Sequence, residues 1–477
     1  MRLAEATPHW ASTRTASLSL SITFLILAGL TVLAAFIPHV EFVAMSLAFL
    51  VAFIAYMRLR PDILPKDILE IIVPVSILHV LYFGIGSLYA VFAPESIVES
   101  SLMPFLPAAQ ALALLGFLCF LGGYAFFFRN AVRASVCGLE PTHALAYVLP
   151  AMLGAAGQSA HRFQVERMLG GLGISPAISL LQQFGVFFYF GWFLAWYQLW
   201  SGRLPWRRAP FVLGPLAFGA FLILFSTFGG KTTAFVILAM PALAYYEVRR
   251  RLPIRWIVVV ALLAVFVIFP IYNTFRFQNA SLETSRRVEM AVDTARTWNS
   301  DQYLDASVYS FLKRLTILTS VAAIVSDTGR WVDYRYGETL ILAPIGLFIP
   351  RFLWPEKPNI SIGREFGAVF RLTSAMDIET EVAPSMVGDF YWNYSVPGVI
   401  IGMLLLGMGY RWYFQKFGVG TDYAPIGKGI YIALMPNALM VEANVAIVIA
   451  GLIKAGLILA ALVAIERRLG WIREIPD

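Results

Sequence analysis

The sequence predicts an all-α polytopic membrane protein with about twelve transmembrane helices. Three observations support this fold class: 59% of the 477 residues are hydrophobic, only 14% are charged, and the mean hydropathy is +0.72. A soluble domain cannot bury that much apolar surface, so the composition indicates a membrane protein. The chain has two cysteines and five scattered histidines, which suggest neither a disulfide framework nor a metal motif.

Twelve apolar segments follow one another along the chain, and each is expected to cross the bilayer. All but the fifth have about the 17–25 residues that a spanning helix needs. The fifth is short and contains Pro150. We interpret the first as a membrane helix rather than a cleaved signal sequence. The expected spans are residues 18–37, 41–57, 67–91, 104–128, 142–157, 174–200, 210–228, 231–248, 255–274, 386–410, 423–440 and 443–465.

Positive charge is distributed unevenly around these spans. If the N-terminus is cytoplasmic, 20 of the 36 Lys and Arg residues lie in the cytoplasmic segments. The short outer loops at 38–41, 92–103 and 441–442 contain no Lys or Arg. This asymmetry follows the positive-inside rule and predicts that both termini are cytoplasmic.

The spans divide the chain into three parts. Residues 1–274 hold the first nine spans, and residues 386–477 hold the last three. Between them, residues 275–385 form one long outer, periplasmic region with 12 basic and 13 acidic residues. Long translocated regions are exempt from the charge rule, so this mixed composition is compatible with the topology.

The outer region is expected to contain two helical segments. Residues 307–329 have the apolar spacing of an amphipathic helix, with Ser307 as a cap and Gly329 as a stop. Residues 340–349 are too short to span and contain Pro344. We expect them to lie in the interface or to re-enter the membrane, where broken backbone is tolerated against protein or a wet cavity.

Positively charged side chains recur on the outer side of the predicted membrane. Arg offers a fork of donors that suits phosphate oxygens, and Lys acts as a point charge. Each side chain could instead reach lipid head groups or pair with a carboxylate, but for the set as a whole we favour anion binding. The residues are Lys231, Arg276, Lys313, Arg314, Arg351, Lys357, Arg364 and Arg371.

Acidic residues lead into the tenth span, where Asp389 stands beside Tyr391 and Asn393. A carboxylate at this depth can act as a general base, or it can pair with one of the arginines. The outer region has no histidine, so the alternative base is His161 on another outer segment. We interpret the alternating acidic residues at 377–381 as solvated rather than as a metal site.

Five segments of the chain carry a resemblance. They are FSTFGGKTTAF (225–235), FLKRLTI (311–317), YGETL (336–340), IPRFLWPEKP (349–358) and PSMVGDFYWNYSVPGVIIG (384–402). In this order, within a protein of twelve expected spans, they resemble the Wzy-type oligosaccharide repeat-unit polymerases of the O-antigen polymerase and ligase superfamily. The resemblance is strongest over residues 310–405, and elsewhere it rests on helix count and layout.

The resemblance implies a membrane glycosyltransferase, similar to the GT-C group, in the bacterial inner membrane. Such an enzyme polymerises oligosaccharide repeat units linked to a polyprenyl (undecaprenyl) diphosphate on the outer face of that membrane. The product is a surface polysaccharide, either an O-antigen or an exopolysaccharide. The resemblance implies no metal and no nucleotide-sugar cofactor. It also makes a chain-length regulator and a flippase candidate partners.

The resemblance also assigns roles to residues. Its matching cations are Lys231, Arg314, Arg351 and Lys357, and its matching acid is Asp389. We therefore predict Asp389 and Arg351 as catalytic. Many relatives carry Arg where Lys231 stands, so a bidentate phosphate contact is not implied there. The predicted contacts to diphosphate and glycan are Lys231, Arg276, Arg314, Lys357, Arg364, Arg371 and Tyr391.

Two other functions remain open at this point. A ligase of the same superfamily would move a finished glycan to another acceptor, and the sequence does not separate it from a polymerase. A transporter or flippase of lipid-linked glycans would show pseudo-symmetric halves with paired broken helices, whereas this chain concentrates its irregular, charged sequence in one outer region. The basic runs flank membrane spans, so nucleic-acid binding has no support. No glycine-rich stretch forms a phosphate loop.

Overall fold

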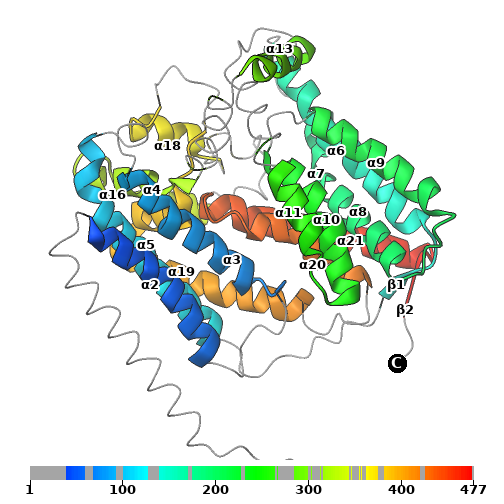
Figure 1. The fold of residues 1–477 in the computed structure, drawn as a ribbon, viewed down its shortest axis with the longest axis horizontal. Coiled ribbons are helices and arrows are strands. Elements are labelled where there is room, and N and C mark those ends of the chain that lie inside the picture. Colours follow the sequence, from blue (N-terminus) through cyan, green and yellow to red (C-terminus); the bar gives the residue numbers. More distant parts are fainter. Residues whose placement is uncertain are drawn as a thin grey trace, which may run out of the picture. The chain divides into compact units, whose positions relative to one another are not determined.

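The described residues fold almost entirely into helices (Figure 1). The computed structural model describes residues 39–59, 68–92, 100–126, 139–169, 175–226, 231–263, 284–298, 315–342, 361–373, 381–418 and 425–474, with the single residues 266, 302, 312, 345, 354 and 356. The predicted first span, 18–37, therefore lies outside the described residues.

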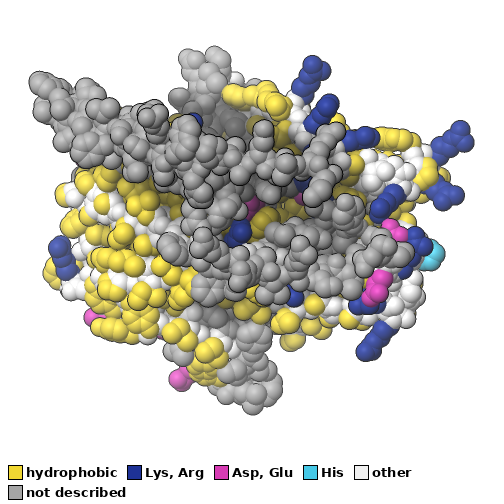
Figure 2. Space-filling view, turned by 90° about the horizontal axis from the view of Figure 1, so that it is seen from below, with side chains coloured by type: hydrophobic (Ala, Val, Ile, Leu, Met, Phe, Trp, Pro, Cys, Tyr) yellow, Lys and Arg dark blue, Asp and Glu magenta, His cyan; other side chains and the backbone are white. Residues whose placement is uncertain are grey.

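Among these residues, seven helices are long and apolar enough to cross a membrane, and the chain is a membrane protein. They coincide with the second, third, fourth, sixth, seventh, tenth and twelfth predicted spans. Their bounds are Val40–Arg58, Ile72–Phe92, Ser101–Ala125, Pro176–Trp200, Ala209–Ser226, Ser385–Gly418 and Val445–Arg468. Figure 2 shows hydrophobic side chains over much of the visible face, as expected for a surface that meets lipid.

Of the other predicted spans, the eighth, predicted at 231–248, matches α10 (Lys231–Arg249), whereas the fifth and the eleventh differ in length from their helices. The fifth span, predicted at 142–157, is the start of a 25-residue helix, α6 (Leu145–Leu169), with Pro150 near its N-terminal end. The eleventh, predicted at 423–440, is the 14-residue helix α20 (Pro425–Ala438). The count of twelve spans and the cytoplasmic placement of the termini stay predictions.

The chain divides into two compact units. Unit 1 comprises Met1–Asn130, Lys313–Tyr413 and Ala438–Ala450, and unit 2 comprises Ala131–Leu312, Phe414–Asn437 and Gly451–Asp477. The elements of unit 1 are α2 (Val40–Leu59), α3 (Ile72–His79), the π-helical turn η1 (Val80–Ile85), α4 (Gly86–Phe92), the 3-10 helix η3 (Ser100–Phe105), α5 (Leu106–Phe126), α16 (Leu318–Asp327), the π-helical turn η6 (Glu338–Leu342), α18 (Gly363–Val369), α19 (Ser385–Tyr413) and the start of α21 (Val445–Arg468).

The centre of unit 1 is the close pairing of α5 with α19. A β-carbon added to Gly123 would lie 2.0 Å from the carbonyl oxygen of Leu404, and one added to Gly407 would lie 2.2 Å from that of Phe120. Lipid offers no hydrophobic drive for helix association, so such small residues favour pairing by letting backbones approach. α2 and α16 pack against the same helix, α5.

A buried polar contact ties the C-terminal part of α19 to the rest of unit 1. Arg411 Nη1 lies 2.9 Å from Glu70 Oε1, and the Tyr124 hydroxyl donates to the same oxygen at 2.7 Å. The Arg411 guanidinium also lies over the Tyr124 ring. With these contacts the carboxylate is paired and hydrogen-bonded, as a buried charge requires.

Unit 2 is built around α6. Its elements are β1 (Leu139–Pro141), α6, α7 (Pro176–Gln183), α8 (Val186–Trp200), α9 (Ala209–Ser226), α10 (Lys231–Arg249), α11 (Ile254–Leu263), α13 (Thr284–Thr297), the π-helical turn η7 (Phe414–Gly418), most of α20, the rest of α21 and β2 (Ile472–Glu474). α7, α8 and α9 pack on α6, and α10 packs on α8. Gly191 allows this close packing, because its β-carbon would lie 2.1 Å from the carbonyl oxygen of Tyr147.

The structure is consistent with the predicted all-α fold class and adds one small sheet that was not predicted. β1 and β2 form an antiparallel two-stranded sheet in which Glu140 faces Arg473 across the strands. Arg473 Nε donates to Glu140 Oε1 at 2.7 Å. Strands of three residues, far apart in sequence, have no periodicity that a single sequence can show.

The outer region also differs from its prediction. The amphipathic helix expected over 307–329 is described as α16 from Leu318 to Asp327, and most of the residues before it lie outside the described ranges. Gly329 follows the helix end with a φ of +79°, in agreement with its predicted role as a stop. The segment predicted to re-enter, 340–349, is described mainly as the end of η6. α13 and α18 were not predicted.

A buried ion pair in unit 2 gives a first testable prediction. Lys428 Nζ on α20 lies 2.7 Å from Glu247 Oε2 on α10, and both side chains are buried. Lys428→Met would leave the Glu247 carboxylate with Arg250, which is 3.4 Å away and more exposed. We expect a loss of about 3 kcal/mol, measured as a lower Tm of the purified protein in detergent.

The double variant Lys428→Met/Glu247→Gln is the control for this prediction. It also removes the negative charge of Glu247, which Lys428→Met leaves without its buried partner, so part of the decrease in Tm should be reversed. A Lys428→Met protein with the wild-type Tm would show that the pair does not stabilise unit 2.

Candidate functional site

The N-terminal end of α19 carries the most densely connected polar group of unit 1. The helix begins at Ser385, whose φ is +65° and whose backbone N–H donates to the carbonyl oxygen of Glu442 at 2.8 Å. The next residue, Met386, donates to Val441. These two bonds fix the entry of α19 against the turn that leads into α21.

Asp389 lies one turn into α19 and is fully buried. Its Oδ1 accepts hydrogen bonds from the Thr339 hydroxyl at 2.6 Å and from Asn393 Nδ2 at 3.1 Å. Its Oδ2 accepts the backbone N–H of Val445, the first residue of α21, at 2.8 Å. A carboxylate at a helix N-terminus is favourable because the helix dipole and the free N–H groups both attract negative charge. Asp389 therefore links α19, η6 and α21.

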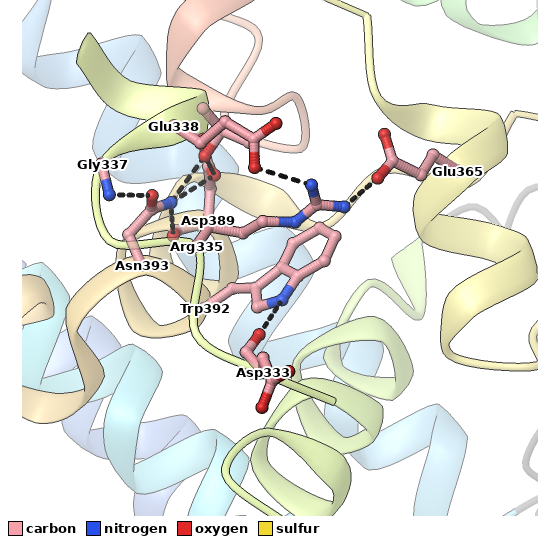
Figure 3. Close-up of polar contacts among 9 residues, drawn as sticks. Asp333, Arg335, Gly337, Glu338, Glu365, Asp389, Trp392 and Asn393 are labelled. Atoms are coloured by element: carbon pink, nitrogen blue, oxygen red, sulfur yellow. Dashed lines mark hydrogen bonds and ion pairs between the residues drawn. The ribbon is translucent and has the colours of Figure 1, made fainter. Parts of the chain in front are cut away.

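We call residues 333–339 the strap, because they are fastened along the first turns of α19 by five hydrogen bonds (Figure 3). Trp392 contributes two of them: its indole Nε1 donates to the Asp333 carbonyl oxygen, and its own carbonyl oxygen accepts the backbone N–H of Arg335. Asn393 contributes two more, since its Oδ1 accepts the N–H of Gly337 and its Nδ2 donates to the Thr339 hydroxyl. The fifth is the bond from Thr339 to Asp389.

The strap can follow α19 because of unusual backbone angles at two successive residues. Tyr336 has a φ of +46° and Gly337 a φ of +93°. A φ of +93° lies in the region that favours glycine, so the conformation of the turn explains the residue at position 337. The turn directs the next residue, Glu338, to the start of η6.

Arg335 is held from three sides. Its Nη1 lies 2.8 Å from Glu338 Oε2, its Nη2 pairs with Glu365 on α18, and its guanidinium lies 4.6 Å from the centroid of the buried Trp392 ring (Figure 3). A guanidinium gains from both the planar carboxylate contacts and the aromatic face. Its side chain is 20% exposed, whereas those of Glu338 and Glu365 are 40% and 45% exposed. The site thus presents two accessible carboxylates on one fixed cation.

The polar residues of α19 are followed directly by a stretch of strained backbone. α19 is interrupted at Tyr394 and Ser395, and Ser395 has a φ of 55° and a ψ of −150°. Pro397 follows the interruption inside the helix. A non-glycine residue with such angles costs about 1–3 kcal/mol and is found most often where function requires it. The break therefore supports a functional reading of the polar turn from Asp389 to Asn393.

The predicted site residues fall into three groups. Asp389, Tyr391, Arg364 and Arg371 lie in the described part of unit 1, and Tyr391 is half-buried on α19. The side chain of Lys231, the first residue of α10, is not described, although its backbone is. The remaining predicted residues, Arg276, Arg314, Arg351 and Lys357, lie outside the described residues.

Arg364 and Arg371 come from the segment that covers Trp392. They stand near the two ends of α18, whose Phe366 and Phe370 lie 5.8 Å and 5.0 Å from the Trp392 ring, centroid to centroid. Arg364 is exposed, with Nε 3.9 Å from Glu381 Oε1, a pair of little strength. Both arginines are exposed, and Arg364 directly precedes Glu365, which pairs with Arg335 of the strap.

The burial of Asp389 bears on its predicted role. Both carboxylate oxygens accept hydrogen bonds from the protein, and none of these described hydrogen-bond donors is an arginine. The arrangement favours a positioning role, since an acceptor hydroxyl has no access to a fully buried carboxylate. Its role as a general base stays a prediction.

Sequence reasoning did not select Arg335, Glu338, Thr339 or Glu365. The segment YGETL contained two of them and was used only for the resemblance. One signal was available, because Asp389 and Asn393 stand four residues apart and must share one face of a helix. The residues that this helix face contacts could not be predicted from the sequence, since the strap lies about 50 residues upstream. Within the described ranges, no three His, Cys, Asp or Glu side chains converge as metal ligands.

The comparisons with known proteins identify one family. Residues 179–417, half of the chain, match the model of a domain of unknown function (DUF8712). The matched region includes the strap and the polar turn of α19. No curated protein and no solved structure matches the chain.

Proposed function

The chain belongs to the family of this domain of unknown function, and we propose that it is a membrane glycosyltransferase that polymerises oligosaccharide repeat units linked to a polyprenyl diphosphate. The observation that carries the proposal is the pair of half-exposed carboxylates, Glu338 and Glu365, fixed on Arg335 at the polar end of a membrane helix. The resemblance of the chain to Wzy-type polymerases supplies the substrate class.

Glycosyl transfer needs a base for the acceptor hydroxyl and positive charge near the departing diphosphate. We assign the base to Glu338, because it is accessible and directly follows the part of the strap that Asn393 anchors. Glu365, which pairs with the same Arg335 guanidinium, is the alternative base. Asp389 then acts as a positioning residue, which holds Thr339 and with it the start of η6.

The reaction we propose balances as follows. The acceptor hydroxyl oxygen bonds to the anomeric carbon of the growing chain, and its proton passes to Glu338. The bond from that carbon to the diphosphate oxygen breaks, and its electron pair leaves with the polyprenyl diphosphate. Arg351 and the other predicted cations would stabilise that charge. Of these cations, Arg364 lies in α18 beside Glu365, which pairs with Arg335, and Arg371 follows that helix.

The proposed setting is the outer face of a bacterial inner membrane. A flippase would deliver the lipid-linked unit, and a chain-length regulator would act on the product. We propose no metal and no nucleotide sugar for the reaction, since the diphosphate is itself the leaving group.

Arg351→Ala tests the predicted cation outside the described residues. Loss of one preorganised charge at the leaving group should reduce transfer about 10²-fold or more, while expression and Tm are unchanged. Arg330→Ala is the matched control, because Arg330 is exposed on the turn after α16 and has no proposed role. Transfer by Arg351→Ala at the wild-type rate would remove Arg351 from the site.

One observation favours a transporter as a second candidate. α19 is a discontinuous helix, and broken helices form the substrate sites of many carriers. Yet the break is a single one within the first half of α19, and the half-exposed carboxylates of Glu338 and Glu365 lie on the strap and on α18 beside the first turns of this helix.

A reconstituted assay separates the candidates. Purified protein in liposomes is given a lipid-linked repeat unit, and the lipid-linked products are resolved by length. A ladder of longer glycans indicates a polymerase, whereas transfer of one intact glycan to a different acceptor indicates a ligase. Movement of the unit across the bilayer without any new glycosidic bond would contradict the enzyme proposal.

A further inference from the structure

Unit 2 contains a cavity at the end where α8 leads into α9, far in the chain from the strap. Its volume is about 810 Å³. The walls come from the residues before α6, the loop between α8 and α9, and the C-terminal strand β2. The lining residues that carry the argument are Glu140, His143, Arg203, Arg208, Phe211 and Arg473.

The lining is positively charged. Arg203, Arg208 and Arg473 face the cavity with a single carboxylate, Glu140. Glu140 is 18% exposed and binds two of the three: its Oε1 lies 2.6 Å from Arg473 Nη2, and its Oε2 lies 3.3 Å from Arg203 Nη1. A guanidinium has five N–H donors, so each of these arginines keeps donors for a ligand. Within the described residues, no ion pair of Arg208 is found.

Two helices begin at the same cavity. Ala144 lies just before α6, and Arg208 lies just before α9; both line the wall. The N-terminal end of a helix carries partial positive charge and free backbone N–H groups, which attract anions. The helix ends and the three arginines therefore favour the same kind of ligand, one with negative charge.

Aromatic side chains indicate that this end of unit 2 lies at a membrane surface. Phe211 on α9 is 81% exposed, and Trp206 in the loop is 67% exposed. The Trp206 ring lies against Trp200 at the end of α8, with centroids 6.0 Å apart. Exposed aromatic residues beside arginines are typical of the interface between lipid tails and head groups.

We propose that this cavity binds a phosphate-bearing ligand, with Arg203 and Arg208 as its main contacts. Glu140 holds the guanidinium groups of Arg203 and Arg473 in fixed positions and so pre-organises the site for a phosphate. Arg is suited to phosphate because its planar fork matches two oxygens. The phosphate belongs either to an anionic phospholipid of the surrounding leaflet or to a free phosphate compound.

The test uses the full-length purified protein and two probes. In the first arm, native mass spectrometry counts phosphatidylglycerol retained by the protein, with phosphatidylcholine as the zwitterionic comparison. In the second arm, the Tm is followed in lipid-free detergent as inorganic phosphate replaces chloride at constant ionic strength. The variants are Arg208→Gln and Arg203→Gln/Arg208→Gln. Arg207→Gln is the matched control, since Arg207 is exposed in the same loop and does not line the cavity.

We expect Arg208→Gln to weaken binding of the effective probe about tenfold, because a hydrogen bond to a charged group is lost. The double variant should weaken it further, and Arg207→Gln should bind like the wild type. Binding in the first arm alone identifies a lipid head group, and binding in the second arm alone identifies a free phosphate. The proposal is overturned if neither probe binds, or if Arg207→Gln loses as much as Arg208→Gln. The single variant keeps the test decisive should the double variant misfold in gel filtration.

Discussion

Glu338→Gln should reduce glycan transfer by about 10²–10⁴-fold, the contribution that a positioned general base makes. The substitution keeps the shape of the side chain and removes its ability to take the acceptor proton. The fold should persist, because Glu338 is 40% exposed and its partner Arg335 still pairs with Glu365. The rate of lengthening of a lipid-linked glycan and the Tm are measured on the same preparation.

Glu365→Gln is the matched comparison for this prediction. Both carboxylates are half-exposed and bind the same guanidinium, so the two variants disturb Arg335 alike. If Glu338 is the base, Glu365→Gln should retain most of the transfer rate. Equal and complete loss in both variants would mean that only the fixed Arg335 matters, and loss in Glu365→Gln alone would move the base to α18.

Asp389→Ala should give the largest loss of stability in the site. It would leave two buried donors, the Thr339 hydroxyl and the Val445 N–H, without their acceptor, whereas the Asn393 amide keeps its bonds to the Thr339 hydroxyl and to the backbone carbonyl oxygen of residue 389. Unsatisfied buried donors cost about 1–3 kcal/mol each when they cannot relax. We expect a total loss of about 3–5 kcal/mol, because part of this cost is relieved by rearrangement. The Tm of the purified protein in detergent measures it.

Asp389→Asn separates the two roles considered for this residue. As a positioning residue, Asn retains one acceptor oxygen and should lower the Tm by an intermediate amount, with transfer falling in parallel. A variant with wild-type Tm and no transfer would instead make Asp389 the general base. Thr339→Val serves as the control, since it removes one hydrogen bond of the same carboxylate and leaves the other two.

The membrane spans could be predicted well, because the ability of a helix to cross the bilayer depends on the length and composition of its own segment and not on distant contacts. A continuous apolar stretch is long enough to cross a bilayer whatever surrounds it. Seven predicted spans therefore match helices of the described chain. The fifth and eleventh differ in length, since Pro150 was taken as an interruption where the helix tolerates it, and α20 is two residues shorter at each end than the predicted 423–440.

The site could be predicted only in part, for a physical reason. Asp389 and Asn393 were noticed because polar residues are rare at the mouth of a span. Their partners could not be found, because five hydrogen bonds join the strap to residues 50 or more positions away. Arg335 and Glu365 meet only through the fold. The same holds for Trp392, which is buried beneath the Arg335 guanidinium.

The proposed chemistry at the strap is tested most directly by the products formed from one lipid-linked repeat unit. Purified wild type, Glu338→Gln and Arg330→Ala are incubated with it in parallel, and the lipid-linked glycans are sized by mass spectrometry. We predict a ladder of longer glycans with the wild type and Arg330→Ala, and only the starting unit with Glu338→Gln. A ladder of equal length and yield from Glu338→Gln, or no lengthening by the wild type, would contradict the account.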